Sequence, residues 1–215
     1  MLEIINISLK WNSTKEKPFI KNLNLKIKNG NILCLFGKSG VGKSSLINAI
    51  AGTTDDNLIF EGKIVLNGKI LNNIPIEKRK IGLLLQDGAL FPHLTVEQNI
   101  YFGMNRKIKS KEKLILINEN LKKANMEGFQ DRYPYTLSGG QKARIACLRA
   151  MLSEPEVLLL DEPFSSLDPE HRNTFKNFVI SRVKESNIPC LLVTHDETDK
   201  LISNEKPIDL SMFTK

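Results

Sequence analysis

Gly37-Lys-Ser-Gly-Val-Gly-Lys43-Ser44 decides the fold of this chain. The segment matches the pattern G-x-x-x-x-G-K-[ST], in which backbone N–H groups surround phosphates, the lysine reaches the outer phosphates and the hydroxyl binds Mg²⁺. The apolar run Ile32–Phe36 before it predicts a buried strand, and Leu46–Ile50 after it predicts a helix that Gly52 ends. This order predicts a nucleotide-binding α/β sheet. The expected nucleotide contacts in the loop are Gly37, Ser39, Gly40, Gly42, Lys43, Ser44 and Ser45.

The bulk composition is that of one soluble globular domain. The chain has 215 residues, of which 41% are hydrophobic and 26% are charged. It contains no apolar run long enough to span a bilayer, and Met1–Asn6 lacks the layout of a signal peptide. We therefore expect a protein of the cytoplasm that reaches a membrane only through a partner. The isolated cysteines at 34, 147 and 190 favour reduced core thiols over disulfides or a zinc site.

The formal net charge is +7, which would suit nucleic acid, anionic lipid or polyphosphate ligands. The lysines are scattered and form no dense basic block. A generally solvated basic surface is the first interpretation, and proximity to the anionic inner leaflet of a membrane is the second.

Three further apolar runs predict strands that are buried on both faces of a parallel sheet: Ile81–Leu85, Val157–Leu160 and Leu191–Val193. A polar residue follows each run. In an open α/β sheet, ligands bind beyond the carboxyl ends of the strands, so we expect these residues to converge on the phosphates. They are Gln86, Asp161 and the pair Thr194-His195.

The rest of the chain divides into two kinds of pattern. Period-two alternation in Leu23–Lys28 and Lys63–Leu71, with the turn signal Asn67-Gly68, predicts a small antiparallel sheet. From 87 to 155 the pattern is helical, with a capping box at Thr95–Gln98. We expect one domain, with the α/β core at 1–86 and 156–215 and an inserted helical subdomain at 87–155. The predicted apolar helix positions are Leu114, Ile117 and Leu121 in one helix and Ile145, Leu148 and Leu152 in the next.

Two adjacent carboxylates end the run Val157–Leu160. A buried carboxylate is costly without a cation or partner, so Asp161 is expected to hold Mg²⁺ and Glu162 to polarise the attacking water. The alternative is that one of them caps the turn before Pro163. His195 is expected to contact the γ-phosphate and hold that water, although an isolated histidine at a strand end is more often structural.

A second anion site is predicted where Ser138-Gly139-Gly140-Gln141 opens a helix. The alternative is a plain helix start with Ser138 as N-cap. Asp168 before Pro169 predicts another N-cap, which is compatible with a contact between subunits. Trp11 lies in the first strand region, where it either stacks on a base or packs in the core. His93 and His171 are expected to be ordinary surface residues.

Taken in order, these motifs resemble the complete series of an ATP-binding cassette (ABC) ATPase, a P-loop NTPase with a RecA-like sheet, over nearly the whole chain. The resemblance implies that Trp11 stacks on adenine, that Gln86 senses Mg²⁺ and the transport subunit, and that Lys43, Glu162 and His195 act in ATP hydrolysis. It implies metal contacts from Ser44, Gln86 and Asp161. It also implies that nucleotide contacts from Ser138, Gly139, Gly140, Gln141 and Asp168 complete the site in a homodimer, where each chain closes on the ATP of the other.

Two stretches, 86–95 and 161–168, are similar to importer cassettes that serve uptake of thiamine, molybdate, sulfate, iron or polyamines. The resemblance implies a peripheral ATPase on the cytoplasmic face of the membrane. Its expected ligands are ATP and Mg²⁺, and its expected partners are transmembrane permease subunits and an extracytoplasmic solute-binding protein. Two departures are that Leu85 replaces the frequent aromatic residue before the glutamine, and that the regulatory extension of some importers is not expected.

Two other classes of function fit these motifs less well than transport. A soluble ABC ATPase of DNA repair or translation usually has a long coiled coil, zinc cysteines or a second cassette, and none is evident, so no nucleic-acid partner is expected. A GTPase or small-molecule kinase is the other class, but it would leave the Ser138–Gln141 element unexplained. The guanine-binding motif Asn-Lys-x-Asp is also absent from the sequence. Apolar residues after Gln86 either form a groove for a short permease helix or pack internally. They are Leu90, Phe91 and Leu94.

Overall fold

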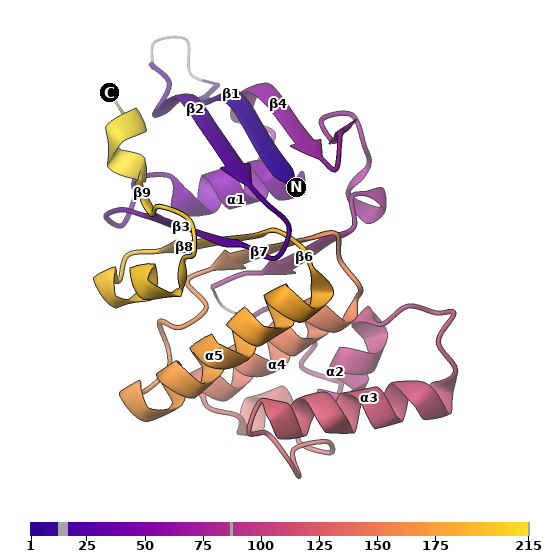
Figure 1. Cartoon of the computed structure of the whole chain (residues 1–215). Coiled ribbons are helices and arrows are strands. Elements are labelled where there is room, and N and C mark those ends of the chain that lie inside the picture. The colour runs from indigo at the N-terminus through magenta and orange to yellow at the C-terminus, as the bar shows by residue number, and fades with distance from the viewer. Residues whose placement is uncertain (13–16, 87, 215) are drawn as a thin grey trace.

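A parallel sheet forms the centre of the molecule. The computed structural model describes residues 1–12, 17–86 and 88–214 (Figure 1). Within this part, all pairings of the central sheet are parallel and the strand order is β6-β7-β8-β3-β9, which confirms the predicted parallel strands. The strands are β3 (Ile32–Phe36), β6 (Ile81–Leu84), β7 (Val157–Asp161), β8 (Cys190–Thr194) and β9 (Ile208–Asp209).

A second, antiparallel sheet lies above the first in Figure 1, as the alternating pattern predicted. Its order is β2-β1-β4-β5, so β1 is an inner strand. The predicted hairpin turn is present, because Asn67 (φ 49°) and Gly68 (φ 80°) are both left-handed, as a type I′ turn requires. The strands are β1 (Leu2–Trp11), β2 (Ile20–Ile27), β4 (Leu58–Leu66) and β5 (Lys69–Ile70).

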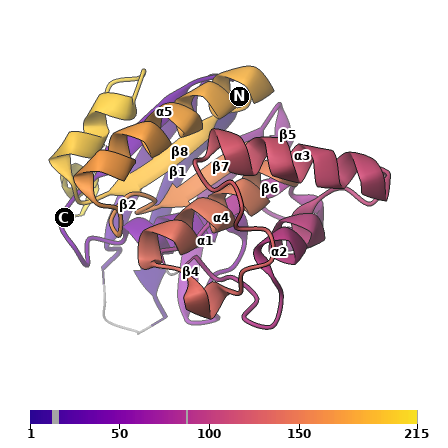
Figure 2. The same cartoon turned by 90° about the horizontal axis from the view of Figure 1, so that it is seen from below.

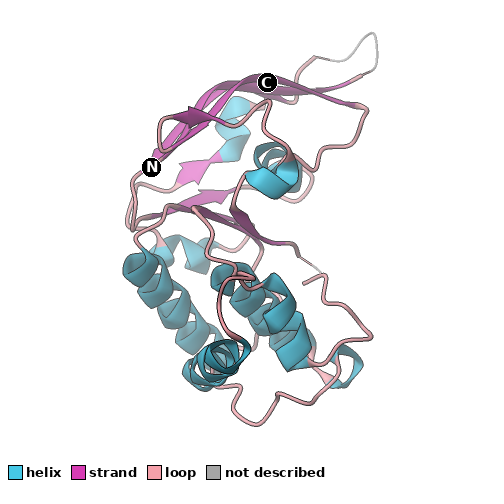
Figure 3. Cartoon of the chain, turned by 90° about the vertical axis from the view of Figure 1, so that its right-hand side faces the viewer, coloured by secondary structure: helices cyan, strands magenta, loops and turns pink. Residues whose placement is uncertain are grey.

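The two faces of the parallel sheet belong to two different hydrophobic clusters. Along β3, Ile32 and Cys34 belong to the cluster formed with the helices below the parallel sheet in Figure 1. Leu33 and Leu35 belong to the cluster formed with the antiparallel sheet above it. This alternation follows from the two-residue period of a strand. Helix α1 (Lys43–Ala51) is sandwiched between the sheets (Figure 3), and Gly52 ends it as predicted, with φ 86°.

Helices cover the other face of the parallel sheet (Figure 2). The capping box predicted at Thr95 starts the first of them, with mutual bonds between Thr95 and Gln98. One cluster joins Leu84 of the sheet, Ile100 and Phe178, so the boundary of a separate helical subdomain at 87–155 stays a prediction. No helix in the described ranges combines the length and apolar character needed to cross a bilayer. The helices are α2 (Val96–Gly103), α3 (Ser110–Lys123), α4 (Gly139–Leu152) and α5 (Pro169–Ser186), and the short 3₁₀ helices are η1 (Ile76–Lys78), η2 (Pro134–Thr136), η3 (Glu197–Ile202) and η4 (Leu210–Phe213).

The predicted apolar stripe of α3 is wrong at one position. Ile117 and Leu121 are fully buried, but Leu114 is 37% exposed. The buried position one turn before Ile117 belongs to Lys113, whose Nζ lies 4.2 Å from the centroid of the Tyr101 ring. A lysine can bury its aliphatic stem when its ammonium has such a partner. The contact with Tyr101 therefore allows Lys113 to take the buried position instead of Leu114.

Candidate functional site

The glycine-rich loop joins β3 to α1 in a conformation that requires glycine. Gly40 and Gly42 have φ of 80° and 99°, a region that residues with a Cβ rarely adopt. Gly42 is the residue before α1, so the free N–H groups of that helix face the loop. A cavity of about 310 Å³ opens beside it, and the residues that line it are Ser39, Gly40, Gly42, Lys43, Ser44, Ser45, Gln86, Glu162 and His195.

Lys43 is a buried cation held by the loop itself. Its side chain is 5% exposed, and its Nζ donates to the carbonyl oxygens of Gly37 at 2.8 Å and Lys38 at 3.0 Å. The carboxylate oxygen Oε1 of Glu162 lies 3.9 Å from the same nitrogen. The ammonium therefore sits between the phosphate loop and the acidic strand end.

Asp161 is a buried carboxylate with one unsatisfied oxygen. Its Oδ1 has no hydrogen-bond partner among the residues that the structure describes. Burial raises the pKa of Asp161, while a hydrogen bond from the Ser44 side chain opposes this shift. A divalent cation bound between the Ser44 hydroxyl and Oδ1 of Asp161 would neutralise the buried charge and give the unpaired oxygen a partner. Hydroxyl and carboxylate oxygens are ligands that suit Mg²⁺. Gln86 lines the adjoining cavity. The predicted metal contacts Ser44, Gln86 and Asp161 therefore have the chemistry that Mg²⁺ requires.

Glu162 turns toward His195. Its Oε1 lies 2.9 Å from Nδ1 of His195, and its side chain is 10% exposed. The residue has φ 49°, a left-handed conformation that costs about 1 kcal/mol or more for a residue other than glycine. Its backbone N–H donates to the Val193 carbonyl at 2.9 Å, which fixes it to the strand that carries His195. The carboxylate thus faces the cavity and does not cap the following turn.

Ser138 forms a capping box at the start of α4. Its hydroxyl accepts from the Gln141 N–H at 3.3 Å, and the Gln141 side chain accepts from the Ser138 N–H at 2.9 Å. Ser138 and Gly139 are exposed, whereas Gly140 packs so closely that an added Cβ would lie 2.6 Å from Cδ2 of Leu167. Ser138 is therefore an N-cap, the free end of the helix still faces solvent, and the anion site at this end stays a prediction.

Asp168 caps α5 as predicted. Its Oδ1 accepts from the His171 N–H at 3.0 Å and contacts Nδ1 of the same histidine at 2.7 Å. These bonds, the backbone bond first, lower the pKa of Asp168. His171 is on the surface, as expected, but it has this partner. Asp168, like Ser138–Gln141, does not line the cavity that contains the phosphate loop.

Residues 20–165 match the model of the family described as "ABC transporter". The chain belongs to the ABC transporter family. It is 38% identical over 215 residues, its whole length and 97% of the relative's, to the uncharacterized ABC transporter ATP-binding protein YnjD of Escherichia coli. This confirms the family and the ATPase cassette inferred from the motifs.

Other relatives of the ABC family are named for import. The chain is 40% identical over 199 residues, 92% of its length and 82% of the relative's, to a probable sulfate/thiosulfate import ATP-binding protein CysA of Chlorella vulgaris. It is 40% identical over 188 residues to an Fe(3+) ions import ATP-binding protein FbpC of Fusobacterium nucleatum, covering 87% of this chain and 50% of that protein. The chain therefore spans only about half the length of some curated relatives.

A solved ABC cassette has the same fold. The dimeric cassette MJ0796, in a structure titled as a post-hydrolysis state bound to ADP and Pi, superposes with a TM-score of 0.81 at 28% identity, covering 94% of this chain and 91% of that chain. This confirms the predicted fold class, an α/β core with an antiparallel sheet.

The ABC motifs of this chain thus fall into two groups within one molecule. The phosphate loop, Gln86, Glu162 and His195 meet at one cavity, with Asp161 beside it. The residues around Ser138 and Asp168 lie elsewhere. Asp87, which belongs to the importer-like stretch 86–95, lies outside the described residues.

One aromatic residue beside the phosphate loop was not predicted from the sequence. Phe19 stacks on Trp11 with ring centroids 5.7 Å apart, and its ring covers Gly42 so closely that an added Cβ would lie 2.8 Å from Cε2. Trp11 itself is 43% exposed and therefore is not a core residue. The two rings form an aromatic surface beside the phosphate loop. Phe19 matches no short motif, so only its position directly before β2 in the folded chain reveals it.

Proposed function

We propose that two copies of this chain bind two MgATP between them and hydrolyse ATP to drive a solute importer. The observation that carries the proposal is the division of the motifs within one chain. Ser138 and Gly139 are exposed at the free end of α4, away from the cavity of the phosphate loop. A helix N-terminus favours an anion, so the exposed end suits the γ-phosphate of ATP held by a second copy.

Each chain would bind its own nucleotide with the phosphate loop. Backbone N–H groups at Gly40 and Gly42 and the Lys43 ammonium would hold the phosphates, and the surface of Trp11 and Phe19 would stack on adenine. Mg²⁺, when bound at Ser44 and Asp161 with Gln86 nearby, supplies charge neutralisation at the phosphates. The closed dimer would form only with the γ-phosphate present, and it would open after hydrolysis.

Glu162 would accept the proton of the attacking water. Its Oε1 already contacts His195 at 2.9 Å, so the imidazole can orient the carboxylate and then contact the γ-phosphate. Lys43, 3.9 Å from Glu162, would stabilise the negative charge that develops on the transferred group.

The importer assignment rests on relatives whose names specify import of iron, sulfate or thiosulfate, and spermidine or putrescine. By analogy, this chain would lie at the cytoplasmic face of the membrane, bound to permease subunits that receive solute from an extracytoplasmic binding protein. A short permease helix would dock where the chain leaves Gln86. There Phe91 contacts Phe102 with centroids 4.9 Å apart, and Phe102 is 68% exposed.

Mixing two inactive variants tests the shared site. Lys43→Ala removes the phosphate contact, and Ser138→Arg blocks the opposite half. A mixed dimer keeps one intact site, formed by the loop of the Ser138→Arg chain and the α4 end of the Lys43→Ala chain. We expect each variant alone to be nearly inactive and an equal mixture to regain about one quarter of wild-type activity, since half of random dimers are mixed. A mixture that stays inactive, or full turnover by a Ser138→Arg monomer, would contradict the proposal.

The soluble alternative in DNA repair or translation is less favoured, because the named relatives are import proteins. Purification from membranes separates the two. Copurification with a polytopic membrane protein supports the importer, whereas hydrolysis that rises when nucleic acid is added supports the alternative.

A further inference from the structure

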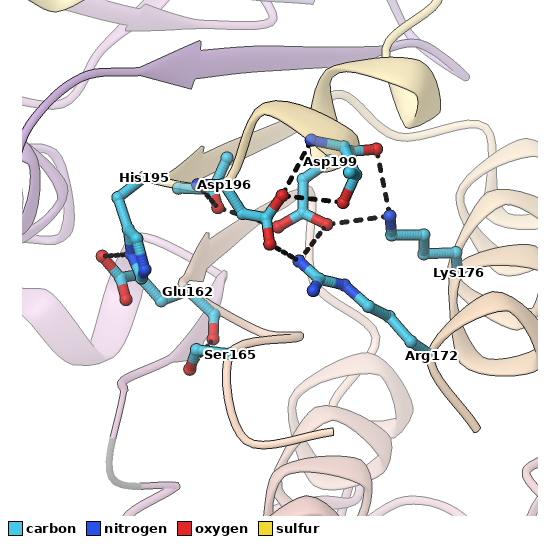
Figure 4. A network of polar contacts seen from close by, with 9 residues as sticks. Glu162, Ser165, Arg172, Lys176, His195, Asp196 and Asp199 are labelled. Carbon is cyan, nitrogen blue, oxygen red and sulfur yellow. Dashed lines mark hydrogen bonds and ion pairs between the residues drawn. The ribbon is translucent and has the colours of Figure 1, made fainter. Parts of the chain in front are cut away.

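A buried carboxylate organises the loop that follows β8 (Figure 4). Asp199 is 1% exposed, and its Oδ1 receives Nη2 of Arg172 at 2.8 Å and Nζ of Lys176 at 2.9 Å. Its Oδ2 accepts from the hydroxyl of Thr194 at 2.8 Å. A buried charge is stable only when it is paired and hydrogen-bonded, and Asp199 satisfies both conditions through two cations and a hydroxyl.

The same groups hold the two residues that flank His195. The Thr194 hydroxyl accepts from the backbone N–H of Asp196 at 3.0 Å. Nη2 of Arg172 also contacts Oδ2 of Asp196 at 2.8 Å. His195 therefore lies between two anchored neighbours, while its own ring is 48% exposed and contacts Glu162. The backbone on both sides of the imidazole is therefore anchored.

The anchor joins two elements that are distant in sequence. Arg172 is in the first turn of α5, where its N–H donates to the Asp168 carbonyl at 3.0 Å. Asp199 lies in η3, which follows β8. A change at the start of α5 must therefore move the histidine loop or break a buried ion pair, and breaking such a pair is costly.

We propose that Arg172 and Asp199 are positioning residues that hold His195 against Glu162 for ATP hydrolysis. The proposal rests on the role given to His195 under the proposed function. If the ion pairs only stabilise η3, their loss should lower activity equally whether or not His195 is present.

Arg172→Met is the central variant. Lys176 still pairs with Asp199, so the buried carboxylate keeps a cation and the chain can fold, whereas Asp196 loses its ion pair and keeps only its bonds from Thr198. Arg182→Met is a matched control, because Arg182 is on the same helix, is equally exposed (19% against 18%) and also forms an ion pair, with Glu185 at 3.0 Å. Arg172→Lys keeps the charge and tests rescue.

Steady-state ATP hydrolysis is the first measurement. Arg172→Met is expected to lower kcat by about 10- to 100-fold through misplacement of the imidazole. KM for ATP should stay within about twofold, because the phosphate loop is untouched. Arg182→Met should match wild type and Arg172→Lys should recover most of the loss. In a His195→Ala background, Arg172→Met should change kcat by less than about twofold, since the two residues act as one unit. Equal losses with and without His195 would overturn the proposal.

A second measurement does not depend on activity. The chain has three histidines, so the ring resonance of His195 in a ¹³C-histidine spectrum is identified by its loss in His195→Ala. We expect Arg172→Met to shift or broaden this resonance and Arg182→Met to leave it unchanged. An unshifted resonance in folded Arg172→Met would refute positioning. Full activity of His195→Ala would instead refute the catalytic role of His195 in the proposed function.

Discussion

The ring of Phe19 covers Gly42 at the point where the phosphate loop enters α1, and a Cβ on that glycine would lie 2.8 Å from ring carbon Cε2. This contact ties the edge of the antiparallel sheet to the nucleotide-binding loop. It gives Gly42 two reasons to be glycine, its φ of 99° and the ring above it.

Gly42→Ala should therefore cost more stability than Gly40→Ala. Both positions have positive φ, but a Cβ at Gly40 meets nothing within 4 Å. We expect the strain at either position to lower the free energy of unfolding by about 1 kcal/mol or more, with a further loss at Gly42 from the collision with Phe19. Urea unfolding without nucleotide measures both. In a Phe19→Leu background, the difference in unfolding free energy between Gly42→Ala and Gly40→Ala should become smaller. Equal losses of stability in the two alanine variants with Phe19 present would show that the ring does not restrict the loop.

Glu162→Gln should separate binding from hydrolysis. The amide keeps the size of the side chain but cannot accept the proton of water, so we expect kcat to fall by about 100-fold or more. ATP binding should persist and closed dimers should accumulate, as measured by nucleotide titration and gel filtration with MgATP. Ordinary turnover by this variant would remove Glu162 from the role of base.

Asp161→Asn tests the metal assignment. The buried oxygen Oδ1 lacks a partner among the described residues, and loss of the charge should weaken the cation site. We expect the Mg²⁺ concentration for half-maximal ATP hydrolysis to rise by at least about tenfold, because loss of even an outer-shell partner of a metal typically costs about 10- to 100-fold in affinity. Asp56→Asn, at an exposed position, serves as the control. An unchanged Mg²⁺ requirement would place the ion elsewhere.

The three thiols should be unreactive in the folded chain. Cys34, Cys147 and Cys190 are free and buried, as the sequence predicted. Burial raises the pKa of Cys34 and of Cys147 to about 12, and it raises that of Cys190 well above its usual value. Because the folded-state pKa values are raised, the thiols stay protonated at pH 8, and their contribution to stability is lost only as the pH rises above about 9, where unfolded thiols ionise. A disulfide reagent at pH 8 should label all three only after denaturant is added, and labelling of the native chain would contradict their burial.

The sequence predicted the parts of the fold that have local signatures. The phosphate loop, the parallel strands and the caps at Thr95, Ser138 and Asp168 each depend on residues within a few positions of one another. Leu114 was predicted wrongly because a helical period does not reveal which of two adjacent positions faces the core. Lys113 takes the buried position through its contact with Tyr101.

Contacts between distant segments were not predictable in this way. Arg172 and Asp199 are 27 positions apart, and neither belongs to a recognised motif. Phe19 precedes β2 of the antiparallel sheet, and Gly42 lies in the loop between β3 and α1. Only the packing of the two layers brings them together, because side-chain partners across a fold depend on the relative placement of whole elements.

Glu162 keeps a left-handed backbone, and this has a cost for the evolution of the chain. Glycine would adopt the same φ of 49° without penalty, so the protein accepts a weaker fold in order to keep an acid there. A laboratory selection for thermal stability alone should enrich glycine at this position and yield variants that are more stable but do not hydrolyse ATP.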